Sequence, residues 1–465
     1  MSDVLSNRYA SKEMREIWSR EFKVKAERRL WITVLETQSL LGFEVSPNVI
    51  QDYKNKIEDI NLASIDSREK ITKHDVKARI DEFNALAGHQ KIHMGMTSRD
   101  LTENIELFQL SSSLELVQLK AAALLKHLAE FARENLEVPM VARTHNVPAQ
   151  LTTLGRRAAS WMEELIYSFS HVEDILRRLP LRGIKGPIGT SQDLFDLFGD
   201  SSQIIENSVA TELGFNQLLI APSQIYPRSI DYEIVTALVQ LASSPSNIAT
   251  NIRIMSGFGL VSEGFAKDQV GSSAMPHKIN ARLSERVNGL TAVLKGNAVM
   301  IQELVGNQWN EGDVSCSVVR RVALSDAFYA VDAILDTTIR IIRELEVQIE
   351  LIAREVNEYL PFLVTTKLLS QAVQNGMGRE DAHALLKKLS ISAKENLKKH
   401  GRNNLFDLVS SEAALGMTTE FLDSVQQTTS LTLNAIHQAR KVIEKAQKVS
   451  EKIPDSLLYT PVDSV

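Results

Sequence analysis

The sequence of 465 residues contains a single cysteine, Cys316, which excludes an internal disulfide and favours a reducing, cytoplasmic compartment. No uninterrupted apolar stretch is long enough to cross a bilayer, so we expect no membrane partner. Cysteines and histidines are not grouped at the spacing of a metal site, and we expect neither a metal nor another cofactor. The net charge of −6 argues against nucleic acid as a partner.

Glycine and proline are also scarce, with 21 and 12 residues, and both are absent from residues 96–138, 156–179 and 313–360. Because both residues interrupt helices, these stretches permit very long helices. In the first stretch, apolar residues recur at three- and four-residue steps, namely Leu110, Leu114, Val117, Ala121, Leu124, Leu128 and Phe131. We therefore predict a helix from about residue 102 to 136, with a length of roughly 50 Å.

Helices this long must pack their apolar stripes against other helices from end to end. This favours a helix bundle that oligomerises through the apolar stripes that remain exposed. A coiled coil is the alternative, but the heptad lacks sustained flanking charges. Strand signals are weak, and the first hundred residues read as shorter helices broken by turns near residues 46–48 and 64–67. The sequence predicts an all-α fold of three helical domains: 1–103, a central long-helix bundle at 104–361, and 362–465.

The densest group of reactive side chains is the segment GSSAMPHKIN at residues 271–280. A Gly-Ser-Ser run followed by proline predicts a loop, which exposes hydroxyls, an ammonium and an amide near a helix amino terminus that favours an anion. By composition alone, a solvated linker of small residues is the better explanation. The string, however, closely resembles the SSxMPxKxN signature of the fumarase/aspartase superfamily. That resemblance implies the superfamily's helical fold and β-elimination with release of fumarate.

Two further segments resemble other regions of the superfamily. Residues 143–146, Arg-Thr-His-Asn, are followed by PAQLTTLG at 148–155, and the resemblance implies that His145 is a general acid. Without the neighbouring motif, a histidine such as His145 is more often an ordinary residue of a surface loop. Residues 97–100, Thr-Ser-Arg-Asp, resemble the region that binds substrate carboxylates through Thr97 and Ser98. An ordinary capping box between Thr97 and Asp100 is the alternative, and both interpretations can hold together.

Other segments resemble the branch of the superfamily that cleaves succinylated purine nucleotides. Residues 72–76, TKHDV, match that branch's T-x-H-D-V motif with His74 as a second active-site histidine, and His277 is typical of the branch. The resemblance implies a small-molecule nucleotide substrate and a catalytic set of Ser272, His145, His74, Glu285 and Lys278. It implies a substrate-binding set of Arg8, Tyr9, Lys73, Asp75, Thr97, Ser98, Gln224, Asn280, Arg286, Ser317 and Arg321.

The roles follow from what elimination requires: a base, an acid for the leaving nitrogen, and stabilisation of the charge that gathers on a carboxylate. By position in the motif, Ser272 is the base, activated by its surroundings. Lys278 and Asn280 bind the carboxylate. Glu285 partners the acid His145, and His74 lies beside the leaving group or phosphate. In the superfamily such residues converge only where three subunits of a homotetramer meet, so we expect a homotetramer with shared active sites.

The sequence departs from the superfamily at two positions. Ala281 replaces a proline, which we expect to affect only loop stiffness, and Gly312 replaces an arginine that binds the substrate. The phosphate is then expected to rely on Arg8, Arg286, Arg320 and Arg321.

Two alternatives remain. One is another lyase of the superfamily, acting on argininosuccinate, aspartate or malate, against which residues 72–76 and His277 speak. The other is a helical scaffold protein without catalytic activity. Such a protein would not need to retain Ser272, His145 and Lys278, and all three are present in this sequence.

Overall fold

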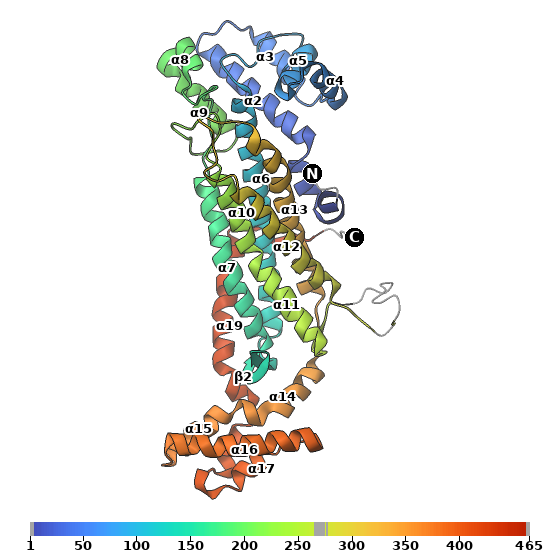
Figure 1. Ribbon diagram of the computed structural model, residues 1–465, viewed down its shortest axis with the longest axis vertical. Helices are drawn as coiled ribbons and strands as arrows, with labels where there is room; N and C mark the ends of the chain where they lie inside the picture. Colours follow the sequence, from blue (N-terminus) through green and yellow to red (C-terminus); the bar gives the residue numbers. More distant parts are fainter. Residues whose placement is uncertain (1–3, 265–274, 276–277, 462–465) are drawn as a thin grey trace.

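The computed structural model describes residues 4–264, 275 and 278–461. They form an elongated, mostly helical molecule (Figure 1), so the predicted all-α fold class is confirmed. Two small antiparallel sheets complete it, β1 (Pro139–Thr144) with β2 (Val147–Thr153), and β3 (Val261–Ser262) with β4 (Glu346–Val347). None of the helices described is long and apolar enough for a membrane span.

Short helices and one long helix form the upper end of the molecule in Figure 1. They are α2 (Arg20–Leu40), α3 (Pro47–Lys54), α4 (Leu62–Thr72), α5 (Asp75–Ala87), α8 (Gln192–Phe198), η2 (Gly199–Ser201) and α9 (Ser202–Glu212). Before them in the chain, η1, a π-helix (Leu5–Tyr9), and α1 (Lys12–Ile17) lie lower, near the N label. The turn predicted at residues 64–67 is wrong, because these residues lie inside α4. The helix starts earlier since the Asn61 side chain accepts the backbone N–H of Ser64 at 2.9 Å and caps it.

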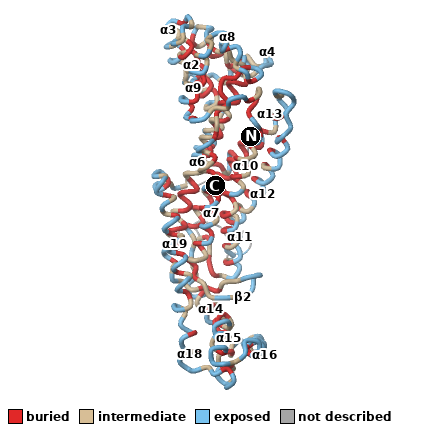
Figure 2. Tube along the Cα trace, turned by 90° about the vertical axis from the view of Figure 1, so that its left-hand side faces the viewer, coloured by how far each residue is buried: buried red, intermediate tan, exposed pale blue. Residues whose placement is uncertain are grey.

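A bundle of long helices forms the middle of the molecule. Its members are α6 (Ser98–Glu134), α7 (Leu154–Arg178), α10 (Ser229–Leu241), α11 (Ser243–Gly257), α12 (Arg282–Gln302), α13 (Ser315–Glu344) and α19 (Thr428–Glu451). The predicted long helix is α6, with 37 residues, and every residue of its predicted apolar stripe is buried. Figure 2 shows the buried residues following the bundle interior along its length.

A second hydrophobic cluster, from Leu360 to Val425, lies at the lower end (Figure 1). It is formed by α14 (Ile349–Leu363), α15 (Thr365–Gln374), α16 (Arg379–His400), α17 (Leu405–Ser410), η3 (Ala413–Leu415) and α18 (Thr419–Ser424). From there α19 returns to pack against α6 and α7, and η4 (Pro454–Leu457) follows. The domain boundaries near residues 103 and 361 stay predictions.

A buried ionic network joins the bundle to segments outside it. The ammonium of Lys120 on α6, which is fully buried, pairs with Asp332 and, at 2.7 Å, with Asp336 of α13. Asp332 also accepts the backbone N–H of Ser11 at 2.7 Å and its hydroxyl at 3.1 Å. The hydroxyl of Tyr459 donates to Asp336 at 2.7 Å. Burial raises the pKa of Asp336 to about 6, although Lys120 opposes this.

The end of α6 and the start of α7 approach each other closely at Gly155. Its backbone N–H donates to the carbonyl oxygen of Asn135 at 2.9 Å. A Cβ added at Gly155 would lie 2.5 Å from the carbonyl oxygen of Ala132 and 2.8 Å from Cα of Leu136. Only glycine therefore fits between the two backbones.

We predict that Gly155→Ala lowers the free energy of unfolding by about 1–3 kcal/mol, because the backbone atoms it meets cannot move aside easily. Urea unfolding measures the change. Gly257→Ala is the control, since its Cβ would meet nothing within 4 Å at the end of α11, and it should leave stability unchanged or raise it by up to about 1 kcal/mol. Equal stability of the two variants would contradict the prediction.

Candidate active site

The amino-terminal end of α6 presents Thr97 and Ser98. The predicted capping box is formed, with the backbone N–H of Thr97 donating to Oδ2 of Asp100 at 2.7 Å. Oδ1 of Asp100 accepts from Nη1 of Arg182 at 2.6 Å and from the backbone N–H of Lys185 at 2.7 Å. Because Asp100 and Arg182 are fully buried, these charge-assisted bonds fix the helix start. The half-buried Thr97 and Ser98 thus lie where backbone N–H groups attract an anion.

Gln224 and Ser317 lie near the same end of the bundle. Arg99, in the first turn of α6, donates through Nη2 to the carbonyl oxygen of Asp313 at 3.2 Å, just before α13. The backbone N–H of Gln224 donates to the carbonyl oxygen of Glu311 at 2.9 Å. Ser317 is half-buried in the first turn of α13. The loop of residues 311–314 thus connects these residues with the start of α6.

Gly312 has a φ of +141°, in the region that L side chains rarely adopt. A Cβ built there would lie 3.4 Å from Ile225 and 3.5 Å from Cβ of Gln224. An arginine at this position would be strained by the backbone itself.

The TKHDV segment connects α4 with α5. Lys73 ends α4 with a left-handed φ of +56°, and Nδ1 of the exposed His74 caps α5 by accepting the backbone N–H of Lys77 at 3.2 Å. Asp75 faces Arg321 of α13 across 3.7 Å. Burial alone would raise the pKa of Asp75, but Arg79 and further cations hold it below its ordinary value. The structure therefore brings the predicted residues Asp75 and Arg321 together.

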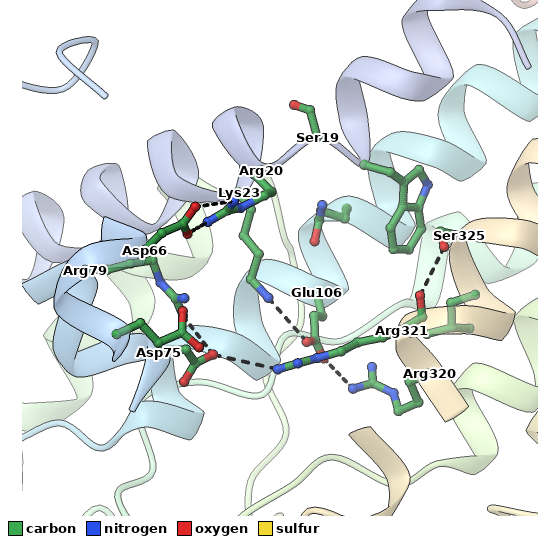
Figure 3. Close-up of a pocket in the computed structure, with 14 residues that line it drawn as sticks. Ser19, Arg20, Lys23, Asp66, Asp75, Arg79, Glu106, Arg320, Arg321 and Ser325 are labelled. Carbon is green, nitrogen blue, oxygen red and sulfur yellow. Dashed lines mark hydrogen bonds and ion pairs between the residues drawn. The ribbon is translucent and has the colours of Figure 1, made fainter. Parts of the chain in front are cut away.

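Asp75 and Arg321 line a cavity of about 520 Å³ between α2, α5, α6 and α13 (Figure 3). Arg321 keeps 69% of its side chain exposed and is available to a ligand. The neighbouring Arg320 points inward, where Nε donates to Asp231 at 2.7 Å and the guanidinium also bonds Glu106 and Tyr226. Contrary to expectation, Arg320 is therefore not available to a phosphate.

His93 is a candidate that reasoning from the sequence missed. It lies four residues before Thr97 with a φ of +73°, which is rare for a residue other than glycine. The indole N–H of Trp31 donates to its Nδ1 at 3.0 Å. Burial, assisted by His74, lowers the pKa of His93 to about 4. Its place in a turn just before the predicted carboxylate-binding hydroxyls was the signal that could have revealed it.

Arg8, Tyr9 and Arg286 form a second group, further down the molecule. The guanidinium carbon of Arg286 lies 5.4 Å from the ring centroid of Tyr9, and that of Arg8 lies 5.8 Å away. Burial lowers the pKa of Arg286, and the neighbouring arginines lower it further. A cavity of about 230 Å³ adjoins the group and is lined by Arg8, Glu263, Asn280, Arg282, Arg286, Arg340 and Glu344, among others. Four arginines against two glutamates favour an anion there.

His145 occupies the two-residue turn between β1 and β2, with φ of +52° for His145 and +60° for Asn146. The histidine is exposed. Glu285 is exposed in the first turn of α12, and within the described part of the chain no hydrogen bond or ion pair joins it to His145. The predicted His145–Glu285 pair is therefore not formed within one chain.

Ser272 and His277 lie outside the described residues. Of the same loop, Lys278 is exposed and its backbone N–H donates to the carbonyl oxygen of Met275 at 3.0 Å, while Asn280 is half-buried. Nowhere in the described ranges do three or more histidine, cysteine or acidic side chains form a group that could hold a metal.

The candidate residues fall into three groups along one chain. The TKHDV segment lies at the upper end in Figure 1, and the β1–β2 hairpin lies near the lower end of the bundle. The Arg8 group lies between them, where the N label marks the start of the chain (Figure 1). A single chain therefore does not bring His145 to His74.

The sequence profile of the lyase family matches residues 10–296. The chain belongs to this lyase family. Together with the motifs above, the match makes the protein a lyase of the fumarase superfamily.

Curated relatives of this lyase extend over most of its length. It is 32% identical over 452 residues to the adenylosuccinate lyase of Saccharomyces cerevisiae, covering 95% of this chain and 93% of that protein. It is 35% identical over 412 residues to the adenylosuccinate lyase of Schistosoma mansoni, covering 87% and 86%.

Solved structures share the fold of the lyase. The 3-carboxy-cis,cis-muconate lactonizing enzyme from Pseudomonas putida superposes with a TM-score of 0.83 at 18% identity, covering 97% of this chain and 100% of that one. A fumarate lyase from Mesorhizobium sp. BNC1 gives 0.80 at 18% identity, covering 94% and 98%. At these identities the likeness shows the fold alone.

The lowered pKa of His93 predicts a pH dependence of stability. A histidine whose folded pKa of about 4 lies below its unfolded value of about 6.5 contributes stability above pH 6.5, which is lost as the pH falls toward 4. Between pH 7 and 4.5 the lyase should lose about 2–3 kcal/mol through this group. His93→Asn removes the titration and tolerates a positive φ. Urea unfolding at both pH values should show a smaller loss for the variant, and an equal loss would contradict the assignment.

Proposed function

We propose that this lyase is an adenylosuccinate lyase of purine biosynthesis. It eliminates fumarate from adenylosuccinate to give AMP, and from the succinylated aminoimidazole carboxamide ribotide to give the free carboxamide. The observation that carries the proposal is the identity of 32% to a yeast adenylosuccinate lyase over 95% of the chain. The TKHDV segment supports it, because His74 is exposed at the end of the bundle where Thr97, Ser98 and Arg321 lie.

The proposed reaction breaks one C–H and one C–N bond. Ser272 takes the proton from the carbon beside a carboxylate, and His145 gives a proton to the leaving nitrogen, so that fumarate and the free amine result. Lys278 and Asn280 stabilise the charge that gathers on the carboxylate in between. The roles of these residues rest on the superfamily resemblance. The exposure of His145 and Lys278 supports it, because neither is committed to the chain's interior.

We further propose that the active site is shared between copies in a homotetramer. The positions of the three groups along the bundle support this, since residues at opposite ends of one chain meet only if chains pack antiparallel. The same arrangement would supply a partner for His145 from the Glu285 of another copy.

Without an arginine at position 312, the nucleotide phosphate needs other cations. We propose that Arg8, Tyr9 and Arg286 bind it together with Ser317 and Arg321, the last two from another copy. Support comes from the excess of positive charge around Arg286 and from the exposed guanidinium of Arg321.

The substrate is tested by fumarate release. The purified protein should release fumarate from adenylosuccinate and from the succinylated ribotide, and none from argininosuccinate. Release from argininosuccinate alone would assign the chain to another branch of the superfamily. Release from none of the three would favour the scaffold protein without catalytic activity.

The acid and base are tested by two variants. Ser272→Ala should abolish turnover while circular dichroism and oligomer size remain unchanged. His145→Gln should lower kcat by about 10²–10⁴-fold and alter the pH–rate profile. Full activity of the first variant would remove Ser272 from the base role, and an unchanged profile of the second would remove His145 from the acid role.

A further inference from the structure

Arg143 lies in β1, two residues before His145, and contacts the turn that holds the histidine. Its Nη1 donates to the carbonyl oxygen of Asn146 at 3.3 Å, and its Nη2 pairs with Glu355 of α14. The β1–β2 ladder has an irregularity between Ala142 and Arg143. The side chain of Arg143 therefore bonds both the turn that follows it and helix α14.

The surroundings of Arg143 hold its guanidinium in place. The guanidinium carbon lies 4.5 Å from the ring centroid of Phe258, at the end of α11, and 5.9 Å from that of Tyr359 on α14. The side chains of Arg143 and Glu355 are only 17% and 11% exposed. A cation between aromatic faces, paired with a carboxylate and shielded from water, is strongly fixed.

The negative charge of Glu355 also acts on a second guanidinium, that of Arg157. Arg157 of α7 donates through Nη2 to the carbonyl oxygen of Val141 at 3.2 Å. Burial lowers the pKa of Arg157, while Glu355 counteracts this. The Glu355 carboxylate thus pairs with Arg143, which joins β1 to α14, and its charge also acts on Arg157 of α7.

The turn itself needs such support. His145 and Asn146 both have positive φ without being glycine, a conformation that costs energy for most residues, although asparagine and histidine tolerate it better than others. Among the described residues, the only side chain that hydrogen-bonds the backbone of these two residues is Arg143. The elimination mechanism gives Arg143 no role of its own.

We propose that Arg143, fixed by Glu355, is a positioning residue that holds the His145 turn in the conformation in which the imidazole serves as the acid. The proposal rests on the proposed function for the role of His145. The ion pair also connects the hairpin to α14, the helix that leads into the hydrophobic cluster at the lower end.

Hydrogen exchange of the hairpin, followed by mass spectrometry on peptides covering residues 139–153, tests the structural part. Arg143→Met should raise the exchange rate of the hairpin amides by about tenfold or more, because the bond from Arg143 to the carbonyl oxygen of Asn146 is lost. Arg143→Lys should give an intermediate rate. Arg156→Met is the matched control, since Nε of Arg156 donates to Gln438 at 2.7 Å and not to the turn. The hairpin amides of this variant should exchange at the rate of the parent protein. Parent-like exchange in Arg143→Met would overturn the proposal whatever the substrate is.

Kinetics test whether Arg143 acts through His145. Arg143→Met should lower kcat by about 10–100-fold with KM within about twofold, as expected when a catalytic group is misplaced. Adding this change to His145→Gln should lower kcat no further. If the double variant instead loses kcat by the product of the two single effects, Arg143 does not act through His145, and the proposal is overturned. If His145→Gln alone keeps full activity, the acid role fails, and the exchange experiment still decides whether Arg143 holds the turn.

Discussion

The buried ammonium of Lys120 is the interaction on which the middle of the molecule depends. It lies inside the bundle with no exposure to water, and two carboxylates of α13 face it. Burial alone would lower the pKa of Lys120, but Asp332 and Asp336 raise it well above its ordinary value, so the charge is kept. Loss of one partner of such a pair typically costs about 3–5 kcal/mol, because the remaining charge is left buried. The pair therefore fixes how α6 and α13 lie against each other.

The position of α6 and α13 in turn determines the candidate active site. Thr97 and Ser98 start α6, and Ser317 and Arg321 lie in the first turns of α13. The same two helices carry the chain away from these residues over the whole bundle, toward the hairpin with His145 (Figure 1). Helix length thus keeps the candidate residues of one chain apart, which is why we propose a site composed from several copies.

Much of the fold could be predicted, because long helices leave a local signal. Absence of glycine and proline, together with a regular apolar stripe, predicted α6, and the Thr97–Asp100 pair predicted its start. The β1–β2 hairpin left no such signal, since its turn is His145-Asn146 and lacks the glycine that usually marks two-residue turns. His93 was missed because its burial depends on Trp31, 62 residues away. Arg320 and Arg321 are neighbours in sequence, and only the packing of α13 decides that one points inward and the other outward.

The bond between Ser11 and Asp332 has a consequence for synthesis of the chain. The two residues are 321 positions apart, so the segment that carries Arg8 and Tyr9 cannot be seated until α13 has left the ribosome. Domains otherwise fold in order as they emerge, with the amino-terminal part first. Here the segment emerges first and docks late, because its binding surface is made from residues translated long after it. Until then Arg8 and Tyr9 remain open to solvent and to whatever binds nascent chains.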